Sequence, residues 1–160
     1  MATELELSLK PGDPAPGFTA LATDGSQVSL SDFTGKPVVL YFYPKDDTPG
    51  CTKEACGFRD VYRQIHKLGA VVLGVSVDSE RAHRKFTEKF QLPFLLLADT
   101  DHRIVSAYGV WGEKAFMGRK YFGTHRVTFL IGPDGRIARI WSKVKPEEHA
   151  AEVLAALKER

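Results

Sequence analysis

Hydrophobic positions in the first half of the chain follow a strand-like pattern and then a helical one. Residues 18–30 predict a small hairpin around the turn Thr23-Asp24-Gly25-Ser26. The run 38–43 is apolar on both faces, which is typical of a central strand that is covered on both sides. From Cys51 to Leu68 the apolar residues recur at helical spacing, and Gly69 is placed to end that helix.

The second half continues this alternation of strands and helices. It predicts a strand over 70–77, a helix capped by Ser79 and running to Phe90, and a strand over 93–97. A short helix follows, capped by Asp99 and Thr100 and carrying Ile104, Val105 and Tyr108, and then a hairpin of 126–131 and 136–141. The last helix is predicted to begin near Pro146, with Glu147 and Glu148 in its first turn and Lys158 and Arg160 in its last. Residues 110–124 break the periodicity, so we expect a long surface loop there.

The element order predicts the fold class. Alternating strands and helices imply right-handed crossovers between parallel strands, and the hairpin near the end adds antiparallel pairs. We therefore expect an α/β protein with a thioredoxin-like fold: a mixed central sheet flanked by helices, with an N-terminal β-hairpin extension. The length of 160 residues suits one domain over 1–160.

Composition and charge narrow the class of protein. Hydrophobic residues make up 43% of the chain, which favours a packed globular fold over disorder. The formal net charge is +2 and no basic stripe occurs, so we expect no nucleic-acid partner. No apolar run approaches the roughly 20 residues of a membrane span, and residues 1–10 do not resemble a signal peptide. We therefore expect a cytoplasmic protein with no membrane association.

The most informative position is Cys51, which follows Pro49 and Gly50 at the start of the predicted 51–68 helix. The free N–H groups of a first helical turn, together with the helix dipole, favour a thiolate there. Cys51 shares a helix face with the apolar residues, so we expect it to face a pocket floor. The alternative interpretation is a buried cysteine that serves as a small hydrophobic residue.

The only other cysteine, Cys56, lies five residues further on. On an ideal helix the two Cα atoms would be roughly 8.5 Å apart, which is beyond the reach of a disulfide. A bond between Cys51 and Cys56 therefore requires the first turns of the helix to unwind. Two thiols are too few for a structural zinc site, and we expect no metal or cofactor. Cys56 could also be an incidental surface thiol.

Two polar residues lie within one helical turn of Cys51. The hydroxyl of Thr48 can accept from the thiol or donate to a bound oxygen, or it can cap backbone amides. Glu54 would oppose ionisation of the thiol unless a cation lies between them, or it is an ordinary first-turn acid. The residues alone leave these interpretations open.

The motif Pro44-x-x-x-Thr48-x-x-Cys51 resembles the active-site motif of the peroxiredoxins, which are thiol-dependent peroxidases. Residues 47–56, Asp-Thr-Pro-Gly-Cys-Thr-Lys-Glu-Ala-Cys, resemble the Q-type or bacterioferritin comigratory subgroup. Further matches at 41–45, 109–114 and 125–131 extend this resemblance over nearly the whole chain.

The resemblance implies a role for each site residue. Cys51 matches the peroxidatic cysteine, which becomes a sulfenic acid, and Cys56 matches the resolving cysteine, which closes an intramolecular disulfide. Arg126 matches an arginine that reaches the thiolate and the peroxide, and Glu54 matches the glutamate that orients it. Thr48 would contact the peroxide.

Pro44 and Gly50 would help to bind the substrate, the latter through its backbone amide. The resemblance further implies hydrogen peroxide or organic hydroperoxides as substrates and thioredoxin or glutaredoxin as the reductant. We also expect a monomer or a weak dimer, because the chain ends at its last predicted helix. Two other classes remain as alternatives: a thioredoxin-fold redox sensor or chaperone module, and a general disulfide oxidoreductase.

Overall fold

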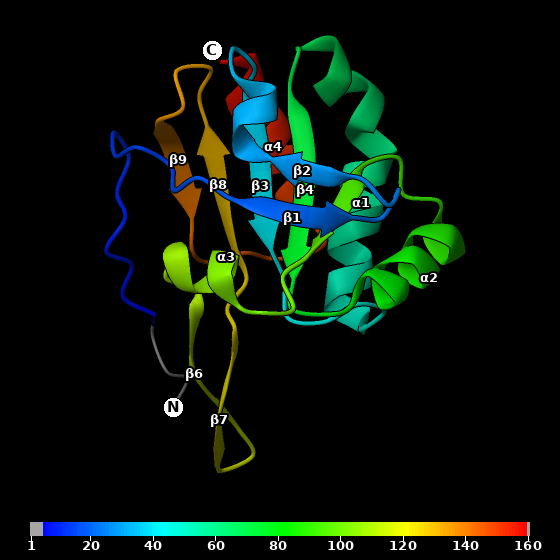
Figure 1. Cartoon of the computed structure of the whole chain (residues 1–160), viewed down its shortest axis with the longest axis vertical. Coiled ribbons are helices and arrows are strands. Elements are labelled where there is room, and N and C mark those ends of the chain that lie inside the picture. The colour runs from blue at the N-terminus through cyan, green and yellow to red at the C-terminus, as the bar shows by residue number, and fades with distance from the viewer. Residues whose placement is uncertain (1–4, 160) are drawn as a thin grey trace.

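The computed structural model of the protein describes residues 5–159. Its elements (Figure 1) are, in chain order, β1 (Thr19–Ala22), β2 (Gln27–Ser29), the 3-10 helix η1 (Leu30–Phe33), β3 (Val38–Phe42), α1 (Pro49–Lys67), β4 (Val71–Ser76), α2 (Glu80–Phe90), β5 (Leu95–Ala98), α3 (Arg103–Ala107), β6 (Trp111–Phe116), β7 (Arg119–Thr124), β8 (Val127–Ile131), β9 (Ile137–Trp141) and α4 (His149–Lys158).

Seven of these strands form one mixed sheet in the order β2-β1-β5-β4-β3-β8-β9. The strands β3, β4 and β5 are parallel to one another, and the other neighbours pair antiparallel. Every residue of β3 is buried, as expected for a strand covered on both faces. The predicted N-terminal hairpin is present, with Thr19 paired to Ser29 and Leu21 to Gln27.

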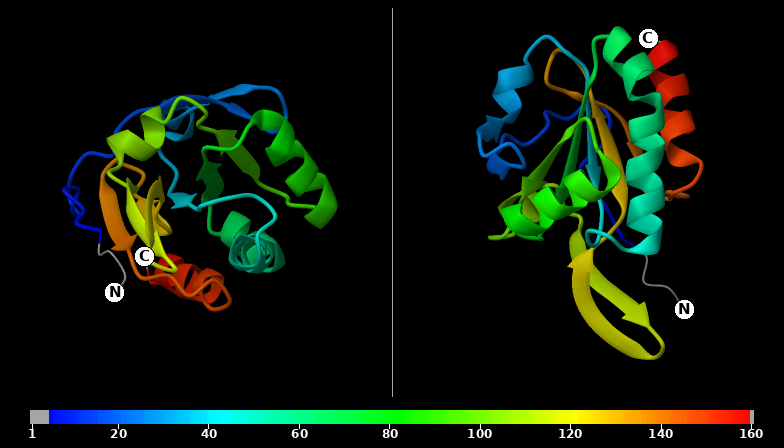
Figure 2. Two further views of the ribbon diagram at one scale, coloured as in Figure 1. Left: turned by 90° about the horizontal axis from the view of Figure 1, so that it is seen from below. Right: turned by 90° about the vertical axis from the view of Figure 1, so that its right-hand side faces the viewer.

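The two faces of the sheet are covered by different elements. Val39 and Tyr41 of β3 point into a core shared with α1, α2 and α4, whereas the alternate residues, such as Leu40, point into a second core with α3 and the N-terminal segment. Helices α1 and α4 lie side by side (Figure 2). A Cβ built on Gly57 of α1 would lie 3.3 Å from the Cβ of Ala150, so glycine allows this close approach.

Several helix ends have the caps expected from the sequence. Ser79 caps α2 by accepting a hydrogen bond of 3.1 Å from the N–H of Ala82. Asp99 accepts from the N–H groups of Ile104 and Val105 at the start of α3, but the N-cap residue of this helix is His102 and not Thr100. Gly69 has φ +79°, a left-handed conformation that ends α1 at little steric cost.

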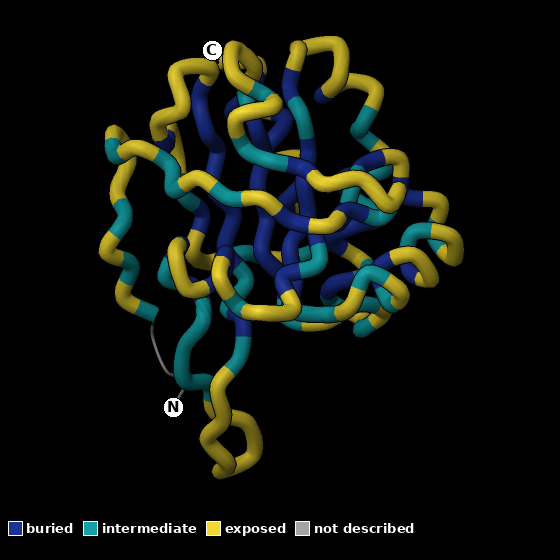
Figure 3. The backbone as a smooth tube through the Cα atoms, viewed as in Figure 1, coloured by how far each residue is buried: buried dark blue, intermediate teal, exposed yellow. Residues whose placement is uncertain are grey.

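The prediction of a long loop over 110–124 was wrong. This segment is a hairpin of β6 and β7 that projects from the body of the molecule (Figure 1). Its two-residue turn consists of Met117 at φ +50° and Gly118 at φ +80°, and two positive values of this kind match the twist of antiparallel strands. The tip of the hairpin is exposed (Figure 3), so it shows no clear alternation of buried and exposed positions from which to predict strands.

The start of the last helix was also predicted too early. Pro146, Glu147 and Glu148 form a turn, in which the N–H of Glu148 donates to the carbonyl of Lys145, and α4 begins at His149. Lys158 lies in the last turn as predicted, whereas Arg160 lies outside the described residues. Within residues 5–159, every helix is too short or too polar to cross a membrane.

Candidate active site

Cys51 lies in the first turn of α1, directly after the loop that leaves β3. Pro49 occupies the first helical position, where its missing N–H costs nothing, and Thr48 is the N-cap residue. The Cys51 side chain is only 2% exposed and faces the core that α1 shares with the sheet. The sulfur therefore lies at a helix N-terminus, as the sequence predicted, and it is shielded from bulk water.

Arg126, just before β8, joins Cys51 to Glu54. Its Nη2 donates to the Sγ of Cys51 at 3.3 Å, and its Nη1 donates to Oε1 of Glu54 at 2.7 Å. A cation thus lies between the thiol and the carboxylate, which removes the electrostatic conflict noted from the sequence. Gly50 makes room for the guanidinium, because a Cβ at this position would lie 3.1 Å from Nη2.

The ion pair is buried on the carboxylate side. Glu54 is completely buried, and its second oxygen, Oε2, has no hydrogen-bond partner among residues 5–159. Burial raises the pKa of Glu54 to about 7, although the charge and the hydrogen bond of Arg126 lower it. Burial also lowers the pKa of Arg126, but the charges of Glu54 and Cys51 outweigh this effect and raise it above its ordinary value. Arg126 therefore stays cationic.

Thr48 does not cap backbone amides, which was one of the interpretations left open. Its hydroxyl donates to the carbonyl oxygen of Lys45 at 2.9 Å. Because the single hydroxyl hydrogen is used in this bond, the lone pairs of the oxygen remain to accept a hydrogen bond. In this conformation Thr48 can accept an O–H from a bound molecule but cannot donate to it.

Cys56 also lies on α1 but not on its buried face. It is half-buried and, like Cys51, it is a free thiol. The helix is continuous from Pro49 to Lys67, so the geometry that prevents a disulfide in a folded helix applies here. The structure is therefore the folded, reduced form of this segment.

Two residues close to the site were not singled out for it by the sequence analysis. His149 of α4 is fully buried, and its Nε2 forms a hydrogen bond of 2.7 Å with Oγ1 of Thr128. Burial lowers the pKa of His149, and the positive charge of Arg126 lowers it further. Burial lowers the pKa of Lys114 in β6, and the positive charge of Arg126 lowers it further, whereas the charge of Cys51 raises it. His125, which precedes Arg126 in the chain, lies with its Nε2 3.1 Å from the carbonyl oxygen of Glu113 in the hairpin.

A hollow of about 310 Å³ lies where the hairpin meets the loop before α1. Its lining combines aromatic residues of the hairpin with polar groups of the loop and of the hairpin: Pro44, Lys45, Val77, Trp111, Lys114, Tyr121, Phe122, Gly123 and Thr124. Pro44 of the predicted site thus lines this hollow, together with Trp111 of β6.

Comparison with known proteins shows to which family the chain belongs. The model of the AhpC/TSA family matches residues 11–140. A relative named Peroxiredoxin Bcp, from Bacillus subtilis, is 48% identical over 153 residues, which are 96% of this chain and 98% of the relative. The chain belongs to the peroxiredoxins of the AhpC/TSA family. It is a thiol-dependent peroxidase, as the sequence predicted.

Other relatives place this peroxiredoxin in the Bcp or Q-type subgroup. Peroxiredoxin Bcp of Escherichia coli is 49% identical over 151 residues, covering 94% of this chain and 97% of the relative. The solved structure of Xanthomonas campestris Peroxiredoxin Q has a TM-score of 0.87 at 39% identity, covering 96% of this chain and 98% of that one. The predicted thioredoxin-like fold is confirmed.

The raised pKa of Glu54 predicts a pH dependence for peroxide reduction. Glu54 is ionised above about pH 7 and becomes neutral as the pH falls through that value. A neutral carboxyl orients Arg126 less strongly, so we expect the rate constant to fall through the same pH range. Stopped-flow measurements between about pH 5.5 and 8.5 should show this step in the wild type and not in Glu54→Gln, whose amide does not ionise. A step of equal size in both proteins would assign it to another group.

Proposed function

We propose that Cys51 is the peroxidatic cysteine of this peroxidase and that Arg126, Glu54, Thr48, Pro44 and Gly50 form the site around it. The observation that carries the proposal is the guanidinium of Arg126, which donates to the Cys51 sulfur at 3.3 Å while Glu54 holds its other nitrogen at 2.7 Å. Such a donor is already oriented before the substrate binds, so it costs no reorganisation during the reaction.

The first step transfers one oxygen atom to sulfur. The Cys51 thiolate attacks the terminal oxygen of the hydroperoxide, an S–O bond forms as the O–O bond breaks, and Cys51 becomes a sulfenic acid. The other oxygen leaves with the electron pair of the O–O bond and takes up a proton, which gives water or an alcohol. Arg126 stabilises the negative charge as it moves from sulfur to the leaving oxygen, and the Thr48 oxygen accepts the O–H of the peroxide.

The second step uses Cys56. Its thiolate attacks the sulfur of the sulfenic acid, a disulfide forms, and hydroxide leaves and is protonated to water. This step requires the first turns of α1 to unwind, because the two residues lie five positions apart on a continuous helix. We assign Cys56 as the resolving cysteine because it is the only other cysteine of the chain and lies on the same helix.

The substrate class and the reductant are inferred from the surroundings of the site and from a relative. The aromatic lining of the hollow beside Pro44 suits organic hydroperoxides as well as hydrogen peroxide. The structurally similar Bacterioferritin Comigratory Protein of Xanthomonas campestris has alkyl peroxide reduction activity. A dithiol protein, thioredoxin or glutaredoxin, would reduce the disulfide after each turnover, which requires a reducing compartment such as the cytoplasm. We further propose that residues 1–160 act as one domain, as a monomer or a weak dimer.

Peptide mass spectrometry tests the assignment of the two cysteines. Reduced protein receives less than one equivalent of hydrogen peroxide, and the remaining thiols are then blocked. We expect a disulfide between the peptides of Cys51 and Cys56, and no peroxide consumption by Cys51→Ser. Peroxide consumption by Cys51→Ser at the wild-type rate would contradict the proposal. Coupled assays with a thioredoxin system and with a glutaredoxin system then identify the reductant.

A further inference from the structure

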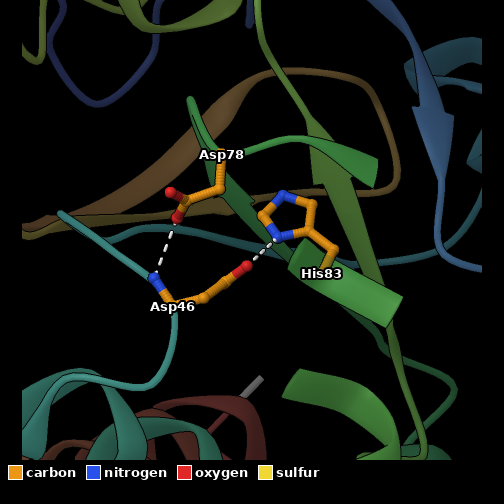
Figure 4. A group of neighbouring side chains, drawn as sticks. All are labelled: Asp46, Asp78 and His83. Atoms are coloured by element: carbon orange, nitrogen blue, oxygen red, sulfur yellow. Dashed lines mark hydrogen bonds and ion pairs between the residues drawn. The ribbon is translucent and has the colours of Figure 1, made fainter. Parts of the chain in front are cut away.

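A second cluster of polar side chains lies in and beside the loop between β3 and α1. Asp46 in this loop, Asp78 after β4 and His83 of α2 converge at the carboxyl ends of the parallel strands (Figure 4). One ligand-type atom of each lies within 4.8 Å of the other two. This composition is that of a cation site, but the hydrogen bonds indicate another role.

Both carboxylate oxygens of Asp46, both ring nitrogens of His83 and one carboxylate oxygen of Asp78 already have protein partners. The carboxylate of Asp46 accepts from the hydroxyl of Tyr43 at 2.5 Å and bonds Nδ1 of His83 at 2.6 Å. The N–H of Asp46 donates to Asp78 at 2.8 Å, and Asp78 also accepts from the hydroxyl of Ser76 at 2.8 Å. A contact of 2.6 Å between Asp46 and His83 leaves no space for a cation between them. We call Tyr43, Asp46, Asp78 and His83 the Asp46 network.

The surroundings of His83 determine where its ring carries a hydrogen. Nε2 of His83 lies 2.9 Å from the carbonyl oxygen of Leu97, which can only accept, so Nε2 carries a hydrogen. The short contact between Nδ1 of His83 and Oδ2 of Asp46 needs a second proton, which is carried by one of these two atoms. Through these bonds a single loop residue, Asp46, is tied to the residue that follows β3, to the turn after β4, to α2 and, through His83, to β5.

The network is linked by short steps to the first turn of α1. Asp46 is followed by Asp47, which has a left-handed φ of +58°, and then by Thr48, the N-cap residue. The hydroxyl of Thr48 donates back to Lys45, and its carbonyl accepts the N–H of Thr52 at 2.8 Å, which is a first-turn helical bond. The first turn of a helix is entropically the most costly to form. A loop that is fixed before the N-cap lowers that cost.

We propose that Tyr43, Asp46 and His83 are positioning residues that hold the start of α1 in the folded form in which Cys51 reacts with peroxide, and that they thereby oppose the unwinding that Cys56 needs. This proposal rests on the assignment of Cys51 and Cys56 made above. It predicts opposite effects on the two steps, because the first requires the folded helix start and the second requires the unwound one.

Asp46→Ala tests the proposal. The rate constant of Cys51 with hydrogen peroxide, measured by stopped flow, should fall about 10- to 100-fold, since displacement of reacting groups by about an ångström has an effect of this size. The rate of disulfide formation after stoichiometric oxidation should rise about fivefold, as expected when a net stabilisation of one hydrogen bond is lost from the folded form. The fraction of Cys51 recovered as sulfinic acid at high peroxide should fall. Equal changes of both rates in one direction, or no change, would overturn the proposal.

Asp46→Asn is the conservative variant that separates hydrogen bonding from charge. Its amide oxygen can accept from Tyr43, and its NH₂ can donate to Nδ1 of a neutral His83, so the network can remain closed. We expect this variant to recover most of the effect of Asp46→Ala on both steps. If instead it is as impaired as Asp46→Ala, the charge of Asp46 or a bound cation is the relevant property, and the hydrogen-bond proposal fails.

A milder pair of variants covers the case in which Asp46→Ala does not fold. Tyr43→Phe removes only the hydroxyl that donates to Asp46. Tyr108→Phe removes the hydroxyl of an equally buried tyrosine in the other core, which donates to the carbonyl oxygen of Pro16 at 2.7 Å. Tyr43→Phe should slow the first step and speed the second, and Tyr108→Phe should change neither. Equal behaviour of the two would overturn the proposal. Peroxide reduction by Cys51→Ser would instead overturn the assignment of Cys51, so the two failures are distinguishable.

Discussion

Replacing Arg126 by alanine should lower the rate constant of Cys51 with hydrogen peroxide by about a thousandfold, the upper part of the range seen when one oriented donor is removed from an active site. Nη2 of Arg126 is within hydrogen-bond distance of the sulfur, where negative charge resides before the reaction and from which it moves during it. Arg126→Lys should recover only part of the rate, because one ammonium group cannot reproduce the planar fork that bonds Cys51 and Glu54 together.

Stopped-flow kinetics with the reduced proteins measure this effect. Arg139→Ala is a matched control, because Arg139 is an exposed arginine on the neighbouring strand β9, where its guanidinium stacks on Trp141. The control should react at the wild-type rate. Loss of Arg126 also removes the influence that lowers the pKa of Glu54, so this carboxyl becomes neutral in the variant and the fold is not left with a buried unpaired charge. A rate within about threefold of the wild type would exclude the proposed role of Arg126.

The sequence predicted the features of the site that depend on local order. Cys51 is preceded by a turn, a proline and a glycine and followed by residues with helical spacing, and these local preferences suffice to place it in a first helical turn. The apolar run of β3 similarly identified the central strand, because a strand covered on both faces has no polar alternation. Local pattern and tertiary structure agree in these segments.

Contacts between distant residues could not be predicted in this way. Arg126 lies 75 positions from Cys51 in sequence, and its position before a strand carries no sign of a partner. Only the resemblance to the peroxiredoxins identified it. The Asp46 network joins residues 37 positions apart, and His149 reaches the vicinity of Arg126 because α4 packs beside α1. None of these residues follows a periodicity that sequence reasoning can detect.

The β6–β7 hairpin illustrates a different limit. Four large hydrophobic side chains at its tip or along it are exposed: Phe116, Met117, Tyr121 and Phe122. Most side chains of this projecting hairpin are exposed or only half-buried, so its strands lack the alternation that identifies strands elsewhere. Its Met117-Gly118 turn is also not one of the common turn pairs. The hairpin nevertheless contributes Lys114 and the aromatic lining of the hollow beside Pro44.

The variant Cys56→Ser should complete one reaction with peroxide at the normal rate but should fail to recycle for further turnovers. The folded site around Cys51 does not involve Cys56, which is half-buried and off the buried face of α1, so the first reaction with peroxide should keep its wild-type rate constant. The sulfenic acid then has no second thiol to attack it. It remains in the folded site beside Arg126, where a second peroxide converts it to the sulfinic acid, which thioredoxin does not reduce.

Steady-state turnover with thioredoxin should therefore fall by about tenfold or more in Cys56→Ser, and mass spectrometry should find sulfinic acid on Cys51. Thr52→Ser is the control on the same helix: it leaves both thiols in place and should recycle as the wild type does. Normal recycling of Cys56→Ser by thioredoxin alone would show that the reductant attacks the sulfenic acid directly. The first turns of α1 would then have no need to unwind, and the folded helix of the reduced form would persist through the whole catalytic cycle.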